Sequence, residues 1–299
     1  MFYEYAIDPD IFKDEMSRRT FLEAFSVNTQ RLISDTPKNW SRHVLQQITA
    51  IPHEICGPQK KKALKERLAK IVKQNLIRNR SIKENKPTWF QLVANEHQRY
   101  PFAAVYTPTP IREPVKSYSF NELDIESPPT WYTRAQAHVK REAKHLVHAA
   151  LPLLSISKEI HLIDRMLKFT EPTWGRYAEL ITELLAVMGT LNYQRGISTL
   201  NIHTSDNYGD ISATAEIKLL PLLPDCIKVN IYQWPHGKMH DRFFLTDIGA
   251  INIGHGLDNH TDNNAEKALV VALDHTTFKE ERAKISGTPV DKITMSKNK

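Results

Sequence analysis

The stretch CIKVNIYQW, residues 226–234, decides the fold of the second half of the chain. Val229 and Ile231 alternate with Lys228 and Asn230, which is the period of a half-buried β-strand. Working outward, similar short stretches recur on both sides, separated by stretches with helical spacing. Strands are predicted at 159–164, 199–204, 226–234, 242–246 and 250–253, and helices at 135–151, 176–189 and 211–220. Strands that alternate with helices predict an α/β domain with a mixed sheet.

The composition is that of a folded protein. Of 299 residues, 41% are hydrophobic and 25% are charged, so the chain can bury a sizeable core. No apolar run approaches about 18 residues, and the opening MFYEYAIDPDIF has acids where a signal peptide carries basic residues. Cys56 and Cys226 are far apart and suggest neither a disulfide framework nor a CxxC zinc site. We therefore expect a cytoplasmic protein without a membrane-spanning helix.

Changes in composition divide the chain into three parts. Residues 1–100 repeat apolar positions every three or four residues at 17–32 and 40–50, which predicts a mainly helical region. Six prolines interrupt any helix in residues 101–133, so this stretch is predicted to be a connection. Residues 134–299 contain the predicted α/β domain.

The net charge of +6 is unevenly distributed. Residues 60–86 hold eleven Lys and Arg against Glu66 and Glu84, so this segment carries +9 and the rest of the chain −3. The spacing predicts an amphipathic helix with one apolar and one cationic face. Its predicted apolar face consists of Leu64, Leu68, Ile71 and Val72. Cationic faces are either solvated or bind nucleic acid or an anionic membrane surface. The residues predicted to contact nucleic acid are Lys62, Lys65, Lys70 and Lys73.

Histidines and charged residues concentrate directly after the quoted strand. His240, Arg242, Asp247 and Gly254 fit the spacing His, any residue, cation, four residues, Asp, six residues, Gly. A start at His236 fails, because a phenylalanine stands where the acid is required. On these residues the chain resembles the phospholipase D superfamily, with arginine in the place of the usual lysine. The sequence HDR…IGHGLD is more specifically similar to the phospholipase D-like C-terminal domain of MIT-domain proteins. It is also similar to bacterial HDR-bearing domains, some of which are linked to phage defence.

The resemblance, which covers residues 155–278, implies a role for each motif residue. His240 would attack phosphorus and form a phosphohistidine, which splits a difficult displacement into two steps. Arg242 would hold the phosphate with its planar fork of donors. Asp247 would orient a histidine and stabilise its charged form. No metal or other cofactor is expected, since the protein supplies the cations. Further residues predicted to line the phosphate are Lys238, His203, His236 and Gly254.

The superfamily mechanism needs a second histidine to protonate the leaving oxygen. One motif per chain implies a homodimer that brings two copies of His240 together. His203 and His236 are the alternatives within one chain. Each motif residue also has a structural interpretation: His240 as a buried polar histidine, and Arg242 as half of an ion pair. A zinc site at His236 and His240 is disfavoured, because the segment after Pro235 is not helical.

Two classes of function follow from these residues. The first is a metal-independent phosphodiesterase that acts on nucleic acid, such as a nuclease of a bacterial defence system. The alternative is a non-catalytic module with a degenerate motif that binds phosphate, lipid, nucleic acid or protein. A subunit of a larger complex, in which a partner supplies the enzyme, is a third interpretation.

Overall fold

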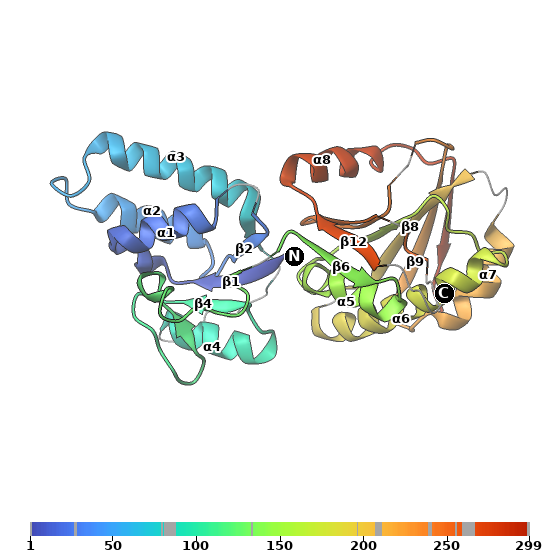
Figure 1. The fold of residues 1–299 in the computed structure, drawn as a ribbon, viewed down its shortest axis with the longest axis horizontal. Coiled ribbons are helices and arrows are strands. Elements are labelled where there is room, and N and C mark those ends of the chain that lie inside the picture. Colours follow the sequence, from blue (N-terminus) through green and yellow to red (C-terminus); the bar gives the residue numbers. More distant parts are fainter. Residues whose placement is uncertain are drawn as a thin grey trace. The chain divides into compact units, whose positions relative to one another are not determined.

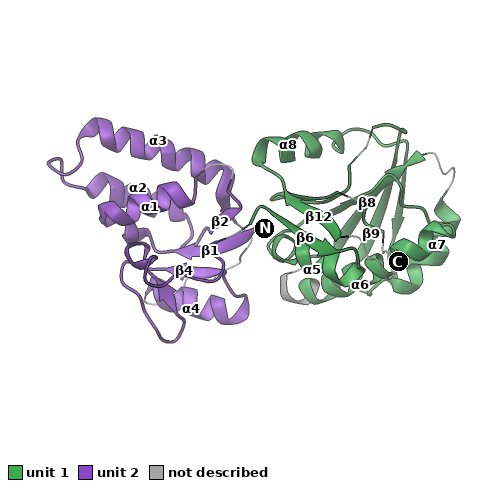
Figure 2. Cartoon of the chain, in the orientation of Figure 1, with its two compact units in different colours: residues 1, 134–299 green, residues 2–133 purple. Residues whose placement is uncertain are grey.

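The structure, a computed structural model, describes residues 2–26, 29–78, 80, 88–132, 134–195, 197–206, 211–238, 241–254, 256–258 and 267–297. The chain divides into two compact units, residues 2–133 and residues 134–299 (Figures 1 and 2). Both units combine helices with a β-sheet, which confirms the predicted α/β class. Within the described residues, no helix is both long enough and apolar enough to cross a membrane.

The N-terminal unit contains a parallel sheet that the sequence analysis missed. Its strands are β1 (Tyr3–Ile7), β2 (Arg31–Ser34), β3 (Leu76–Ile77), β4 (Ala104–Tyr106) and β5 (Ser117–Tyr118). They lie in the order β3-β2-β1-β4-β5, and each pair of neighbours is parallel. Parallel neighbours require crossover connections. Helices supply them from β1 to β4, and residues 107–116, which contain no helix, connect β4 to β5.

Helices cover both faces of this sheet (Figure 1). They are α1 (Glu15–Ala24), α2 (Trp40–Ala50), α3 (Pro58–Asn75) and α4 (Trp89–Arg99), with 3-10 turns η1 (Pro9–Lys13) and η2 (Phe120–Glu122). Aromatic side chains such as Phe21 and Trp40 fill the core under α1 to α3. Val93 of α4 packs with Val105 on the other face. The unit is therefore a three-layer α/β arrangement.

Residues 101–133 are part of this unit and are not the expected connection. They supply β4, β5 and η2, and Phe120 stacks on Tyr106 with ring centroids 4.3 Å apart. The prolines fall between these short strands, where they break helices without preventing strand pairing. The predicted helix at 17–32 is also corrected, because α1 ends at Ala24 and β2 begins at Arg31.

The basic segment is a helix only as far as Asn75. Within it the apolar face is confirmed: Leu68 and Ile71 are buried, and Leu64 and Val72 pack against the same core. The two described cations beyond the helix have acidic partners. Arg78 pairs with Asp35, and Arg80 is buried in the core of the unit.

Arg80 lies between two buried carboxylates. Its Nε and Nη2 each donate to Glu4 at 2.8 Å, and its Nη1 lies 3.2 Å from Glu96. The guanidinium also stacks 3.7 Å from the centroid of the Phe102 ring. The side chains of Arg80 and Glu4 are only 3% and 2% exposed. This ion triad therefore fixes α4 to β1 from inside the fold.

The C-terminal unit is built on a mixed eight-stranded sheet. Its strands are β6 (Gln136–Lys140), β7 (Ile160–Ile163), β8 (Thr199–Ser205), β9 (Lys228–Trp234), β10 (Phe243–Thr246), β11 (Ala250–Ile253), β12 (Lys267–Ala272) and β13 (Asp291–Met295). The order is β13-β9-β8-β7-β10-β11-β12-β6. Only β7, β8 and β9 run parallel to one another, and every other neighbouring pair is antiparallel. The five predicted strands are confirmed to within two residues at each end.

Helices flank this sheet as well. They are α5 (Ala143–Leu154), α6 (Thr173–Arg195), α7 (Ser212–Leu219) and α8 (His275–Lys284), with the 3-10 turn η4 (Leu220–Leu222). Figure 1 shows α8 on the face opposite to α5 and α6. There Phe278 packs against Trp234 and Phe243. The predicted helix at 135–151 is corrected, since its first part is β6 and α5 begins at Ala143.

Candidate phosphate site

The strand directions bring most of the predicted site residues to one edge of the C-terminal sheet. The carboxyl ends of β6, β7, β8, β9 and β11 share this edge with the amino end of β10. Residues at or just beyond these strand ends are Arg141, Asp164, Asp206, His236, Lys238, Arg242, Gly254 and Asp258. Loops at such an edge are common places for ligand sites in α/β proteins.

Two arginines and two aspartates meet at this edge, and we call them the Arg–Asp cluster: Arg141, Asp164, Arg242 and Asp258. Arg141 forms an ion pair with Asp258, and Arg242 Nε lies 3.7 Å from Asp164 Oδ1. Gly256 stands between them with φ +111°. A Cβ there would lie 2.7 Å from Asp258 Oδ1 and 3.2 Å from Arg141 Nη2, so the cluster leaves no room for a side chain at this position.

Asp164 is the buried member of the cluster. Its side chain is fully buried and accepts hydrogen bonds from Tyr177 Oη at 2.8 Å and from the Met166 amide at 2.9 Å. Burial raises the pKa of this carboxyl, and these hydrogen bonds and Arg242 oppose the rise. A carboxylate fixed in this way holds the neighbouring guanidinium in one place.

Arg242 is partly exposed, and its guanidinium is not fully hydrogen-bonded by the described residues. Its side chain is 27% exposed, and Nε has no hydrogen-bond acceptor among the described residues. Asp164 is its ion-pair partner, at a distance longer than a hydrogen bond. The exposed part of a guanidinium can bind an oxyanion with parallel hydrogen bonds, although the Nε of Arg242 is itself buried. The role of Arg242 in holding a phosphate stays a prediction.

Asp247 lies at the opposite edge of the sheet. β10 separates it from Arg242, a distance of about 16 Å along the strand. The exposed carboxylate accepts hydrogen bonds from the amides of Lys158 at 2.8 Å and Glu159 at 3.2 Å. Asp247 therefore fixes the start of β7, and the described residues do not bring it to the Arg–Asp cluster.

His203 is held inside the sheet. Its ring is buried and stacks on Tyr232 with centroids 4.8 Å apart. Trp234 Nε1 can only donate, so His203 Nδ1 accepts at 2.9 Å and the ring proton is on Nε2, which lies 2.8 Å from His161 Nδ1. Burial lowers the pKa of His203 well below its ordinary value. A neutral ring with both nitrogens occupied is not free to bind phosphate.

The remaining predicted residues are spread along the same edge. Lys238 Nζ lies 4.0 Å from the centroid of the Trp234 ring, in a cation–π contact. His236 is exposed, and its amide donates to Asp206 at 2.9 Å. Gly254 is also exposed and continues the pairing of β11 with β12. His240, the predicted nucleophile, lies outside the described residues.

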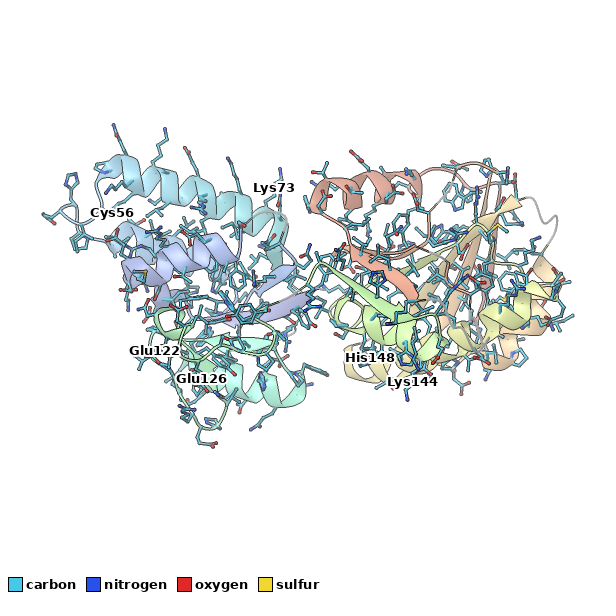
Figure 3. All side chains as sticks on the ribbon, in the orientation of Figure 1. Cys56, Lys73, Glu122, Glu126, Lys144 and His148 are labelled. Atoms are coloured by element: carbon cyan, nitrogen blue, oxygen red, sulfur yellow. The ribbon has the colours of Figure 1, made fainter. Side chains whose placement is uncertain are left out.

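The outer face of α3, defined here as Lys62, Lys65, Lys70 and Lys73, is a separate candidate surface in the N-terminal unit. Three of these lysines are exposed and Lys65 is half-buried. Within the part of the chain that the structure describes, none of the four has an ion pair or hydrogen bond. Figure 3 shows Lys73 pointing away from the unit. The sequence prediction of a cationic face opposite the apolar one is confirmed for this helix.

Sequence reasoning missed part of the Arg–Asp cluster. Asp164 is the last residue of a predicted strand, so its place at the strand end could have been found. The sequence could not place Arg141 at a strand end, because the strand before it was predicted to be helical. Tyr177 was hidden in a helix with many other apolar positions. Among the described residues, no three His, Cys, Asp or Glu side chains lie close enough to hold a metal ion.

The fold and this cluster define a two-unit α/β protein with a candidate phosphate site. No family model and no curated protein matches the chain. Among solved structures, the structure of this chain is similar to that of TrmBL2, which is described as an archaeal chromatin protein with a novel mode of DNA binding. The match covers 55% of this chain and 54% of TrmBL2, with 15% sequence identity and a TM-score of 0.28. A TM-score this low carries no argument about fold or function.

Proposed function

We propose that this protein binds nucleic acid through the phosphate backbone, and that the outer face of α3 makes the contact. The observation that supports this proposal is the set of four lysines without an acidic partner among the described residues. The apolar face of α3 is packed into the core, so the helix holds these like charges together. Their mutual repulsion is relieved when a polyanion binds.

Charge reversal of the four lysines to glutamate is expected to remove most of the binding. Each phosphate contact releases counterions, so four contacts give a slope of about −3.6 in log affinity against log salt for duplex DNA. The slope of the variant should move toward zero. Fluorescence anisotropy with two labelled duplexes of unrelated sequence measures both quantities, and both duplexes should weaken alike because phosphate contacts do not read bases.

A matched control separates this surface from overall charge. Reversal of the exposed Lys144, Lys228, Lys267 and Lys279 changes the net charge by the same amount but leaves α3 intact. This control is expected to retain most of the affinity. If both variants bind equally well, or lose binding equally, the outer face of α3 is only a solvated surface.

A second candidate function is supported by Arg242. We infer that the Arg–Asp cluster binds a phosphodiester, which His240 attacks in the catalytic alternative that the resemblance implies. Since His203 is closed off, the second histidine of this mechanism is His236 or His240 of a second copy in a homodimer. The distance of Asp247 from Arg242 favours the non-catalytic alternative, in which the same cluster only holds the phosphate.

Cleavage assays decide between these two alternatives. The phosphodiesterase predicts cleavage of DNA, RNA or a chromogenic phosphodiester in the presence of EDTA, and loss of this cleavage in His240→Ala. Arg242→Ala should lower phosphate affinity about tenfold or more in either alternative, because a charged hydrogen bond is lost. Folded protein that binds phosphate but cleaves none of these substrates would identify a binding module.

A further inference from the structure

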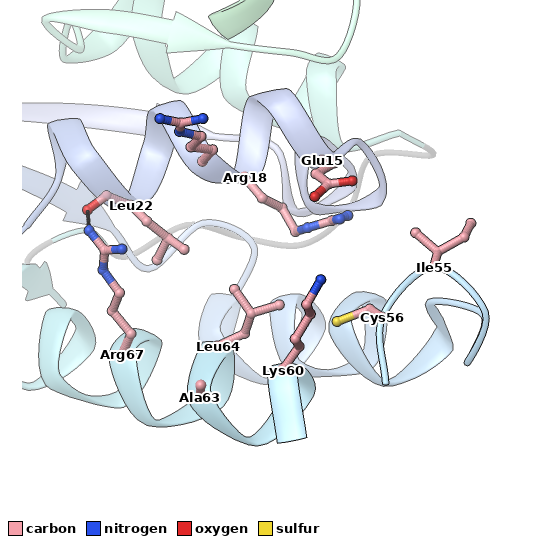
Figure 4. Close-up of a pocket in the computed structure, with 10 residues that line it drawn as sticks. Glu15, Arg18, Leu22, Ile55, Cys56, Lys60, Ala63, Leu64 and Arg67 are labelled. Atoms are coloured by element: carbon pink, nitrogen blue, oxygen red, sulfur yellow. Dashed lines mark hydrogen bonds between the residues drawn. The ribbon is translucent and has the colours of Figure 1, made fainter. Parts of the chain in front are cut away.

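A cavity of ≈ 390 Å³ lies between α1 and α3 in the N-terminal unit (Figure 4). Leu22, Leu64 and Ala63 form much of its wall, together with Ile55 and Cys56 from the segment that precedes α3. Cavities that bind small molecules start at about 300 Å³ and are mostly apolar with a few polar groups. This one has the size and the lining of such a site, and the proposed function does not use it.

The charged groups of the cavity are mostly cationic. Arg18 is 5% exposed and is fixed by hydrogen bonds to the carbonyls of Phe12 at 2.7 Å and Lys13 at 2.9 Å. Lys60 is exposed, and none of the described residues pairs with it. Figure 4 shows the Lys60 amine and the Arg18 guanidinium pointing into the same space. Both cations therefore line the same cavity.

Asp14 interacts electrostatically with Arg18 and offsets part of this excess, but the positive charge remains larger. Glu15 is the one acid of the lining, and Arg67 is a third cation, whose Nη2 donates to the Leu22 carbonyl at 2.8 Å. Arg19 is neutralised by Glu23 at 3.0 Å. The amino end of α3 begins just before Lys60 and adds its own partial positive charge.

From this arrangement we propose that the cavity binds a small amphipathic anion. A carboxylate or phosphate head lies at Lys60 and Arg18, and an apolar body packs against Leu22 and Leu64. The body also covers Ile55, whose side chain is 57% exposed in the structure. A purely apolar ligand would leave Lys60 without a partner, and a cationic one would be repelled by both cations.

Calorimetric titration of the full chain with three probes tests the head group. Decanoate and decyl phosphate share an apolar body with decyltrimethylammonium, which carries the opposite charge. Both anions are expected to bind below their micelle-forming concentrations, and the tighter of the two identifies the preferred head. Decyltrimethylammonium is expected not to bind. Equal binding of all three probes would overturn the proposal, because it would show only a hydrophobic surface.

Three substitutions test where the ligand binds. Ala63→Trp fills the cavity from an exposed position on α3 and should abolish binding of both anions, whereas Ala69→Trp on the same helix, outside the lining, should leave it unchanged. Lys60→Glu is expected to weaken the binding of both anions about tenfold or more, because it removes a charged hydrogen bond. Circular dichroism establishes that each variant is folded. Anion binding that survives Ala63→Trp would place the ligand elsewhere and refute the assignment.

Discussion

Arg80→Met is expected to lower the free energy of unfolding by about 3–5 kcal/mol, the cost of leaving buried charges without their partner. Glu4 and Glu96 are both almost inaccessible, and each has Arg80 as an ion-pair partner. Without the guanidinium, at least one of them must take up a proton or open the core to water. Chemical denaturation at neutral pH measures the loss.

Arg78→Met is the matched control for this substitution. Arg78 is two residues away, and its side chain is 65% exposed, so its ion pair with Asp35 contributes only about 0–1 kcal/mol. The triple variant Arg80→Met, Glu4→Gln, Glu96→Gln should recover part of the lost stability, since it buries no unpaired charge. Equal losses for Arg80→Met and Arg78→Met would show that the triad does not stabilise the unit.

In His203→Gln, the free energy of unfolding is expected to fall less steeply below pH 7 than in the wild-type protein. His203 is neutral when folded, with a pKa well below its ordinary value of 6.5, so below that pH the unfolded chain binds a proton that the folded chain does not. From this residue alone, stability therefore falls as the pH falls, with a slope that approaches about 1.4 kcal/mol per unit well below pH 6.5. Burial also lowers the pKa of His161, which is present in both proteins and adds to both slopes. Denaturation between pH 7 and pH 5 compares the two slopes.

Other titrating groups cancel in this comparison. Burial raises the pKa of Asp8 to about 6, which stabilises the folded chain as the pH falls, but it does so equally in both proteins. His148→Gln is a suitable control, because that ring is exposed on α5 (Figure 3). It should retain the wild-type slope. A wild-type slope no steeper than that of His203→Gln would mean that the folded protein accepts a proton at His203.

The strands of the C-terminal unit could be predicted because they follow simple rules. β9 alternates apolar and polar residues in the sequence, but it is not the expected half-buried strand, because Asn230 and Gln233 are buried as well as Val229 and Ile231. Gly249 and the prolines mark the turns between elements. β6 escaped prediction because it is short and because its exposed and half-buried residues alternate without a strongly apolar face.

The sheet of the N-terminal unit could not be predicted in the same way. Its strands have two to five residues, too few for a period to emerge. β1 is almost entirely buried, yet it contains Glu4, whose charge is compensated by Arg80 from a distant part of the sequence. Local spacing carries no information about such a pairing.

The candidate site was predicted only in part for a related reason. The spacing of Arg242 and Gly254 reflects one antiparallel pair, β10 and β11, which returns the chain to the edge it left. Asp247 falls in the turn of that pair, at the other edge. Only the strand directions, which sequence spacing does not reveal, separate the residues that meet from those that do not.

The pairing of β13 with β9 has a consequence for the order in which the chain is made. β9 is complete when residue 234 has left the ribosome, but its outer row of amides and carbonyls remains uncovered until residue 295 follows. An uncovered strand of this kind is a template for pairing with a neighbouring chain. During synthesis β9 is therefore open to pairing with a neighbouring chain until β13 covers it, and in the folded unit β13 takes over the edge position.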